Sequence, residues 1–158
     1  MKYTCDRSLP FAECELAILR NAIDEAEDIK GFEMANSKEI KDTISIVESF
    51  IKTNNLICYG GTAINNILPE EDQFYDKAKE IPDYDFLSSD ALRHAKELAD
   101  IYYDLGYEEV EAKAGQHFGT YKVFVNFIPI ADITQINKNM FKLLSKEAIS
   151  VDNILYLP

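Results

Sequence analysis

Two aspartates separated by a single residue are the clearest candidates for chemistry in this sequence. Asp83 and Asp85 enclose a tyrosine in the stretch Pro-Asp-Tyr-Asp-Phe. Residues two apart in an extended strand point to the same side, so both carboxylates are expected to face one point. Carboxylates at that range repel each other unless a cation lies between them, and their hard oxygen atoms suit Mg²⁺. The alternative is a solvated, acidic start to the strand.

A third carboxylate lies in an apolar stretch further along the chain. Asp132 is embedded in Ile-Pro-Ile-Ala-Asp-Ile-Thr, with no lysine or arginine adjacent to it in the sequence. Burying a carboxylate without a partner is costly, so we expect Asp132 to open onto a polar cleft or to bind a metal ion. Pro129 leaves a second arrangement open, in which the stretch is an edge strand and Asp132 faces water.

A pair of glycines followed by a threonine is the candidate phosphate-binding element. Gly60, Gly61 and Thr62 lie between a predicted strand and a predicted short helix. Glycines let the backbone approach a ligand closely, and the first turn of a helix offers unpaired N–H groups that favour phosphate. Asn65 follows one helical turn later and is expected either to contact a sugar or phosphate or to cap the helix. The turn alone is equally compatible with a connection that binds nothing.

Hydrophobic periodicity predicts an α/β or α+β domain, in which helices pack on a mixed, twisted β-sheet preceded by two helices. The predicted helices cover residues 10–29, 37–53, 62–68, 90–105 and 138–148, and the predicted strands cover residues 56–59, 84–88, 108–113, 120–127 and 128–134. Asn36 and Glu39 are expected to form a capping box for the second helix, and Gly106 to end the helix at 90–105. Residues 154–158 are expected to form an apolar tail.

Length and charge set the frame for these elements. The 158 residues indicate one domain. Within it, we expect a helical segment at 1–54 to pack on a core at 55–158. We also expect the chain to be a fragment of a longer protein. The formal net charge of -12 counts against strong nucleic-acid binding by this chain alone, because phosphate contacts need Lys and Arg. The sequence contains no apolar run of roughly 18 residues and no signal-peptide stretch, so we expect a cytoplasmic protein with no membrane partner.

Taken together, the three elements resemble the DNA polymerase β-like nucleotidyltransferase superfamily. Its pattern is Gly-Gly followed by Ser or Thr, then Asp-x-Asp, then a lone Asp on a later strand. The stretches ICYGGTAINNILP, IPDYDFLSSDA and AGQHFGTYKVFVNFIPIADIT look like the catalytic subunit of poly(A) polymerases from large nucleocytoplasmic DNA viruses. The resemblance covers roughly residues 50–136 and implies the nucleotidyltransferase fold for the core.

The resemblance also implies a reaction, namely adenylyl transfer from ATP to an RNA 3′ end with release of pyrophosphate. Asp83 and Asp85 would ligate two Mg²⁺ ions, for which Mn²⁺ could substitute, and Asp132 would complete the site of the metal that activates the 3′-hydroxyl. Gly60, Gly61 and Thr62 would hold the β- and γ-phosphates. RNA would be bound mainly by regions outside this chain, and a homodimer or a processivity subunit is a compatible partner. The host cytoplasm or the virion is the expected location.

Two other functions remain compatible with the same residues. Toxin-type nucleotidyltransferases also combine Gly-Gly-Thr-Ala with Asp-x-Asp, and they modify a protein, a tRNA or a small molecule. The acidic net charge of this chain favours that alternative slightly. The third alternative is a non-catalytic binding module that keeps the fold, against which the retention of all three aspartates argues.

Overall fold

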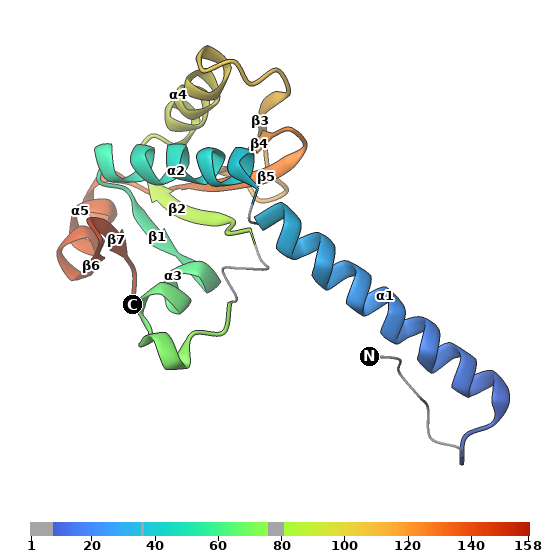
Figure 1. Ribbon diagram of the computed structural model, residues 1–158. Coiled ribbons are helices and arrows are strands. Elements are labelled where there is room, and N and C mark those ends of the chain that lie inside the picture. Colours follow the sequence, from blue (N-terminus) through green and yellow to red (C-terminus); the bar gives the residue numbers. More distant parts are fainter. Residues whose placement is uncertain (1–7, 36, 76–80) are drawn as a thin grey trace.

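The computed structural model describes residues 8–35, 37–75 and 81–158. Across these residues one mixed sheet of seven strands forms the centre of the molecule, in the order β3-β4-β5-β2-β1-β7-β6 (Figure 1). The strands are β1 (Ile57–Tyr59), β2 (Tyr84–Ser88), β3 (Val110–Ala114), β4 (Thr120–Val125), β5 (Ile128–Gln135), β6 (Ile149–Val151) and β7 (Ile154–Tyr156). The β2–β5 and β1–β7 pairs are parallel and the other pairs antiparallel, which confirms the predicted mixed sheet.

The helices surround this sheet in the predicted order. They are α1 (Phe11–Ala35), α2 (Lys38–Thr53), α3 (Gly60–Ile67), α4 (Ala91–Asp104) and α5 (Lys138–Glu147), with a 3-10 turn at Glu70–Asp72. α2 and α4 pack against each other and against the sheet, where Tyr102 is fully buried and donates a hydrogen bond to the backbone oxygen of Thr43 at 2.6 Å. Gly106 has a φ of 98° directly beyond α4, as expected of a glycine that ends a helix.

The two N-terminal helices differ in how they meet the core. α2 contributes Val47, Phe50 and Ile51 to the hydrophobic core. α1 extends away from the sheet in Figure 1, and its apolar residues Phe11 and Leu16 are exposed. None of the described helices is long and apolar enough to cross a membrane.

The cap of α2 differs from the prediction. Ser37 is the N-cap residue, and its hydroxyl oxygen accepts a hydrogen bond from the backbone N–H of Ile40 at 3.2 Å. Asn36, the predicted cap, lies outside the described residues. With Ser37 as the cap, Glu39 is the second helical residue and not the third, so it is not in the capping-box position; one of its carboxylate oxygens accepts a hydrogen bond from the side chain of Asn126 at 2.8 Å. Serine and asparagine are equally good caps, so the sequence alone does not separate adjacent candidates.

The C-terminal residues are a strand and not the expected tail. β7 runs parallel to β1, with Leu155 beside Ile57 and Tyr156 beside Cys58, and β6 pairs with its other edge. The side chains of Ile154 and Tyr156 are buried. The apolar character of this stretch therefore reflects its burial beside β1.

Candidate active site

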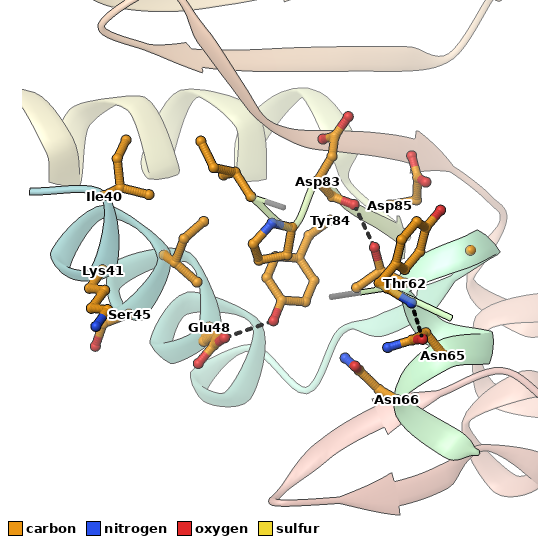
Figure 2. Close-up of a pocket in the computed structure, with 15 residues that line it drawn as sticks. Ile40, Lys41, Ser45, Glu48, Thr62, Asn65, Asn66, Asp83, Tyr84 and Asp85 are labelled. Carbon is orange, nitrogen blue, oxygen red and sulfur yellow. Dashed lines mark hydrogen bonds between the residues drawn. The ribbon is translucent and has the colours of Figure 1, made fainter. Parts of the chain in front are cut away.

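β2 separates its acidic and aromatic side chains onto opposite sides. Tyr84 and Phe86 are buried, and the hydroxyl of Tyr84 donates a hydrogen bond to Glu48 on α2 at 2.7 Å. Asp83, directly before β2, and Asp85 point the other way, away from α2 (Figure 2). This is the arrangement that a period of two along a strand predicts, and it leaves both carboxylates on one face.

β5 places the third carboxylate on that same face. β2 and β5 are parallel neighbours, and Asp85 is in register with Asp132. Side chains in register on adjacent strands share a face and lie close together. The structure therefore brings together three carboxylates, although Asp83 and Asp132 are 49 positions apart in the chain.

The carboxylates interact electrostatically. Partial burial, followed by the negative charges of Asp132 and Asp85, raises the pKa of Asp83 to about 6. Partial burial and the charge of Asp132 also raise the pKa of Asp85. Both shifts mean that the ionised carboxylates are destabilised where they stand, so a cation between them would be bound favourably. Since every candidate ligand is a hard oxygen, the donor set fits Mg²⁺ or Mn²⁺.

A lysine on the next strand contacts the third carboxylate. Lys122 of β4 is in register with Asp132, and its Nζ lies 3.0 Å from Oδ1 and 2.9 Å from Oδ2. The charge of Lys122 also lowers the pKa of Asp83 and of Asp85 against the stronger effects that raise them. Asp132 was expected to open onto a polar cleft or to bind a metal ion, since no basic residue is adjacent to it in the sequence. Its basic partner comes instead from a neighbouring strand.

The three carboxylates do not enclose a common point in this arrangement. Within the described part of the chain, no group of three or more His, Cys, Asp or Glu side chains is arranged to hold a metal ion. Asp83 and Asp85 stand as an open pair, and both oxygens of Asp132 are engaged by Lys122. The donor chemistry fits a divalent cation, and a cation held by all three carboxylates would compete with Lys122 for the oxygens of Asp132.

The glycine turn directly adjoins the carboxylates. β1 ends at Tyr59, and Gly60 begins α3 with a φ of 79°, a conformation that side chains disfavour. A Cβ on Gly60 would lie 3.0 Å from Oδ2 of Asp85. The Thr62 hydroxyl donates to the backbone oxygen of Asp83 at 3.1 Å (Figure 2). The candidate phosphate turn and the aspartate pair are thus linked at two points, one of which only glycine permits.

Asn65 is buried and takes part in a local hydrogen-bond arrangement. Its side chain is 1% exposed, and its Oδ1 accepts hydrogen bonds from the backbone N–H groups of Phe74 and Tyr75 at 2.8 and 2.9 Å. These bonds hold the segment after the 3-10 turn against α3. A Cβ on Gly61 would lie 2.6 Å from the hydroxyl of Tyr75, so this segment also packs on the glycine turn. A nucleotide contact by Asn65 stays a prediction.

A cavity of about 550 Å³ opens beside these residues (Figure 2). Its volume is in the range of small-molecule sites. Residues of α2 line it on one side, and residues of α3 and of the segment from Ile81 to Asp85 line much of the rest. The lining residues that matter here are Ile40, Ile44, Thr62, Asn66, Asp83 and Asp85.

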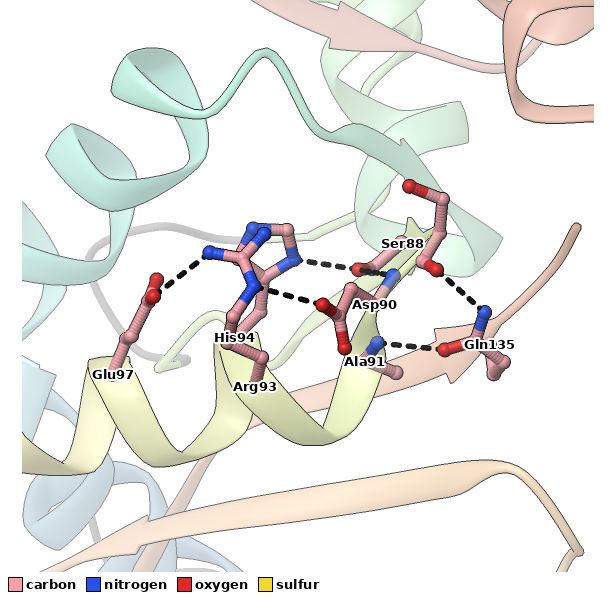
Figure 3. A network of polar contacts seen from close by, with 8 residues as sticks. Ser88, Asp90, Ala91, Arg93, His94, Glu97 and Gln135 are labelled. Atoms are coloured by element: carbon pink, nitrogen blue, oxygen red, sulfur yellow. Dashed lines mark hydrogen bonds and ion pairs between the residues drawn. The ribbon is translucent and has the colours of Figure 1, made fainter. Parts of the chain in front are cut away.

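A polar network at the far end of β2 holds the two acidic strands together (Figure 3). The Oε1 of Gln135 on β5 accepts a hydrogen bond from the N–H of Ala91, and its Nε2 donates to the backbone oxygen of Ser89, both at 2.8 Å. Ser88 and His94 are buried with a distance of 2.6 Å between Oγ and Nδ1. Nothing in the local sequence singles out Gln135, because its partners lie 44 and 46 positions away.

Comparison with known proteins identifies relatives of this chain. The sequence pattern of the poly(A) polymerase catalytic subunit family matches residues 45–158. Proteins provisionally named poly(A) polymerase catalytic subunits from African swine fever virus and Acanthamoeba polyphaga mimivirus are 35% identical over 107 residues and 32% identical over 121 residues. These matches cover 68% and 75% of this chain but 22% and 20% of the two relatives, so the chain spans about a fifth of their length.

The fold is shared with a solved structure as well. The crystal structure of the Megavirus polyadenylate synthase matches this chain with a TM-score of 0.79 and 30% sequence identity, over 99% of this chain and 31% of that one. This agreement confirms the predicted fold class, a mixed sheet with helices packed on it. Because the family pattern extends over most of the sequence, this chain belongs to the poly(A) polymerase catalytic subunit family of large DNA viruses.

Proposed function

We propose that this chain supplies the nucleotidyl-transfer site of a polynucleotide adenylyltransferase, which adds AMP from ATP to RNA 3′ ends and releases pyrophosphate. One observation carries the proposal. In a member of this family, a glycine turn lies against Asp85, and Asp85 lies in register with Asp132. A phosphate-binding turn directly beside a cluster of carboxylates is the arrangement that metal-dependent phosphoryl transfer requires.

Asp83, Asp85 and Asp132 would hold the divalent cations, Mg²⁺ or Mn²⁺. When bound, these ions would neutralise charge on the phosphates and activate the attacking 3′-hydroxyl. The raised pKa values of Asp83 and Asp85 support this assignment, because they reveal carboxylates whose ionised form gains from a nearby cation.

The backbone of the glycine turn would hold the triphosphate. Gly60 and Gly61 lack side chains at the point where the chain approaches Asp85, so a phosphate chain can reach the same place. Thr62 fixes the start of α3 to the backbone of Asp83, which keeps the distance between turn and carboxylates constant. The protein therefore contributes alignment and charge stabilisation more than acid–base chemistry.

The acidic net charge indicates how RNA would be bound. At -12, this chain offers little electrostatic attraction to a polyanion. The RNA 3′ end would enter the site while most backbone contacts come from parts of the protein beyond this chain. The host cytoplasm or the virion is the proposed location, as in the viral family.

The test is transfer of label from α-labelled ATP to an oligo(A) primer by the full-length protein with Mg²⁺. We expect a ladder of extended products, and Asp83→Asn or Asp85→Asn to reduce turnover by at least about a thousandfold with unchanged folding. Asp100→Asn on the exposed face of α4 removes the same charge and is the matched control.

Other outcomes of this assay would point elsewhere. Label on a protein or a tRNA, with no primer extension, would support the toxin-type alternative. Wild-type turnover in Asp83→Asn or Asp85→Asn would end the assignment of the site. Failure to incorporate label, combined with no Mg²⁺-dependent binding of ATP, would support a non-catalytic module.

A further inference from the structure

The ion pair between Lys122 and Asp132 is unusual in its place and in its geometry. A single ammonium contacts both oxygens of the carboxylate, at 3.0 and 2.9 Å. The two side chains are 35% and 19% exposed, so Asp132 is more shielded from water than Lys122 is. Charge-assisted contacts of this kind are stronger than neutral hydrogen bonds, and they compete with a metal ion for the same two oxygens.

The pair belongs to a row of charged side chains across one face of the sheet. Lys113 of β3 is in register with Lys122, Lys122 with Asp132, and Asp132 with Asp85. Asp132 therefore stands between an ammonium on one side and a carboxylate on the other. Lys122 contacts Asp132 on the same face of the sheet as Asp85. This is the face on which Asp85 and Asp132 would share a cation.

We propose that Lys122 is a built-in competitor for the metal ion that Asp132 helps to hold, a proposal that rests on the proposed function above. With Lys122 in place, the described carboxylates form no three-ligand group, and release of Asp132 is needed to complete one. The lysine keeps Asp132 paired before metal arrives. Completion of the metal site then requires exchange of a monovalent ammonium for a divalent cation.

The exchange sets the order in which ligands bind, with the nucleotide before the metal ion that Asp132 helps to hold. A bound triphosphate brings several anionic oxygens to the glycine turn, next to Asp85. These oxygens offer the ammonium of Lys122 a new partner, so release of Asp132 costs less when nucleotide is present. Asp132 thus becomes available to a metal ion chiefly in the complex with nucleoside triphosphate.

The test measures Mn²⁺ binding directly, by the electron paramagnetic resonance signal of free Mn²⁺ in titrations of the full-length protein without nucleotide. We expect Lys122→Met to bind Mn²⁺ about tenfold more tightly than the wild type, because the competing charge is gone. Lys113→Met, one place further along the same row, is the matched control and should change the affinity little. Lys122→Gln keeps a neutral hydrogen-bond donor beside Asp132 and should also tighten Mn²⁺ binding. It replaces Lys122→Met as the test variant if Lys122→Met does not fold.

Two further measurements separate competition from a merely structural ion pair. In an Asp132→Asn background, Lys122→Met should no longer tighten Mn²⁺ binding. With a non-hydrolysable ATP analogue bound, the difference between wild type and Lys122→Met should shrink to less than about twofold. If the ion pair only joins β4 to β5, Lys122→Met should alter the melting temperature. It should leave the affinity for Mn²⁺ unchanged, both with and without the ATP analogue.

The possible failures are distinguishable. If Asp83→Asn and Asp85→Asn weaken Mn²⁺ binding but Lys122→Met and Lys122→Gln bind as the wild type does, the competition is refuted while the proposed function stands. If Asp83→Asn and Asp85→Asn bind Mn²⁺ like the wild type, the metal site itself is refuted, and the inference about Lys122 falls with it.

Discussion

Gly60 is the residue at which the phosphate turn and the carboxylates meet. Its φ of 79° is one that side chains disfavour, and any Cβ would press against Asp85. Gly106 offers a matched comparison within the same chain, since its φ is 98° and a Cβ there would meet nothing within 4 Å. The two glycines share a backbone requirement, but only Gly60 also has a neighbour in the site.

We therefore predict different effects of alanine at these two glycines. Gly60→Ala and Gly106→Ala should each cost about 1 kcal/mol of folding free energy from backbone strain. Only Gly60→Ala should also reduce primer extension, by at least about tenfold, because it displaces the Asp85 carboxylate. Thermal melts and turnover of the two variants, measured side by side, check this prediction. Equal turnover would show that the contact with Asp85 is unimportant.

At the residue scale, the sequence predicted the shared orientation of Asp83 and Asp85 better than it predicted the hydrogen-bond partners of Asp132 and Asn65. Asp83 and Asp85 are two positions apart, so strand geometry alone predicts that their side chains share a face. The structure places both on one face. The link between Asp132 and Lys122 depends on the pairing of β4 with β5, which no short stretch of sequence encodes. Asn65 likewise binds backbone groups nine and ten positions away, through a fold of the chain that local pattern does not reveal.

The elements that carry the site are β2 and β5, and their alignment decides whether three aspartates can act together. A slip by one residue would turn Asp132 to the opposite face of the sheet. The Gln135 side chain opposes such a slip, since it bonds the backbone of Ser89 and Ala91 beyond the end of β2. We therefore expect Gln135 to act as a positioning residue for the proposed site, from the other end of the strand.

We predict that Gln135→Met destabilises the protein by about 1 to 3 kcal/mol, because backbone groups lose their partners. It should also lower kcat more than it raises the KM for ATP, since the glycine turn is untouched while Asp132 loses its alignment. Gln116→Met, an exposed residue in the turn between β3 and β4, is the control. Destabilisation with unchanged kcat at a temperature where the variant is folded would contradict the positioning role.

Most elements were predictable from hydrophobic periodicity, and the exceptions have physical reasons. β2 was predicted with its observed bounds, and the long helix before Gly106 differs from α4 by one residue at each end. β6 and β7 were missed because three residues carry little periodicity, and neither strand is followed by a signal like the glycine pair that marks the end of the equally short β1. The apolar residues of β7 are explained by its pairing with β1, which the local sequence does not reveal.

At the scale of the whole molecule, we expect the clustered carboxylates to make stability depend on metal ions. Folding brings three carboxylates together, and a bound cation would offset their repulsion. A ligand that binds only the folded state stabilises it by about 2.7 kcal/mol at a concentration one hundred times its Kd. The melting temperature should therefore rise with Mg²⁺ and ATP.

We predict that this rise depends on the aspartate pair. Differential scanning fluorimetry of the full-length protein should show a clear increase in melting temperature with Mg²⁺ and ATP for the wild type and for Asp100→Asn. Asp83→Asn and Asp85→Asn should show a much smaller increase, although both should melt at or above the wild-type temperature without metal, since each removes one repelling charge. An equal increase in all four proteins would place the metal elsewhere.

A crystal structure with Mn²⁺ and a non-hydrolysable ATP analogue is the most direct test of the central claim. We predict anomalous density for Mn²⁺ at about 2.0–2.2 Å from carboxylate oxygens of Asp83 and Asp85, with the triphosphate on the glycine turn and Asp132 released from Lys122. A triphosphate bound away from Gly60, or Mn²⁺ density remote from both aspartates, would contradict the account.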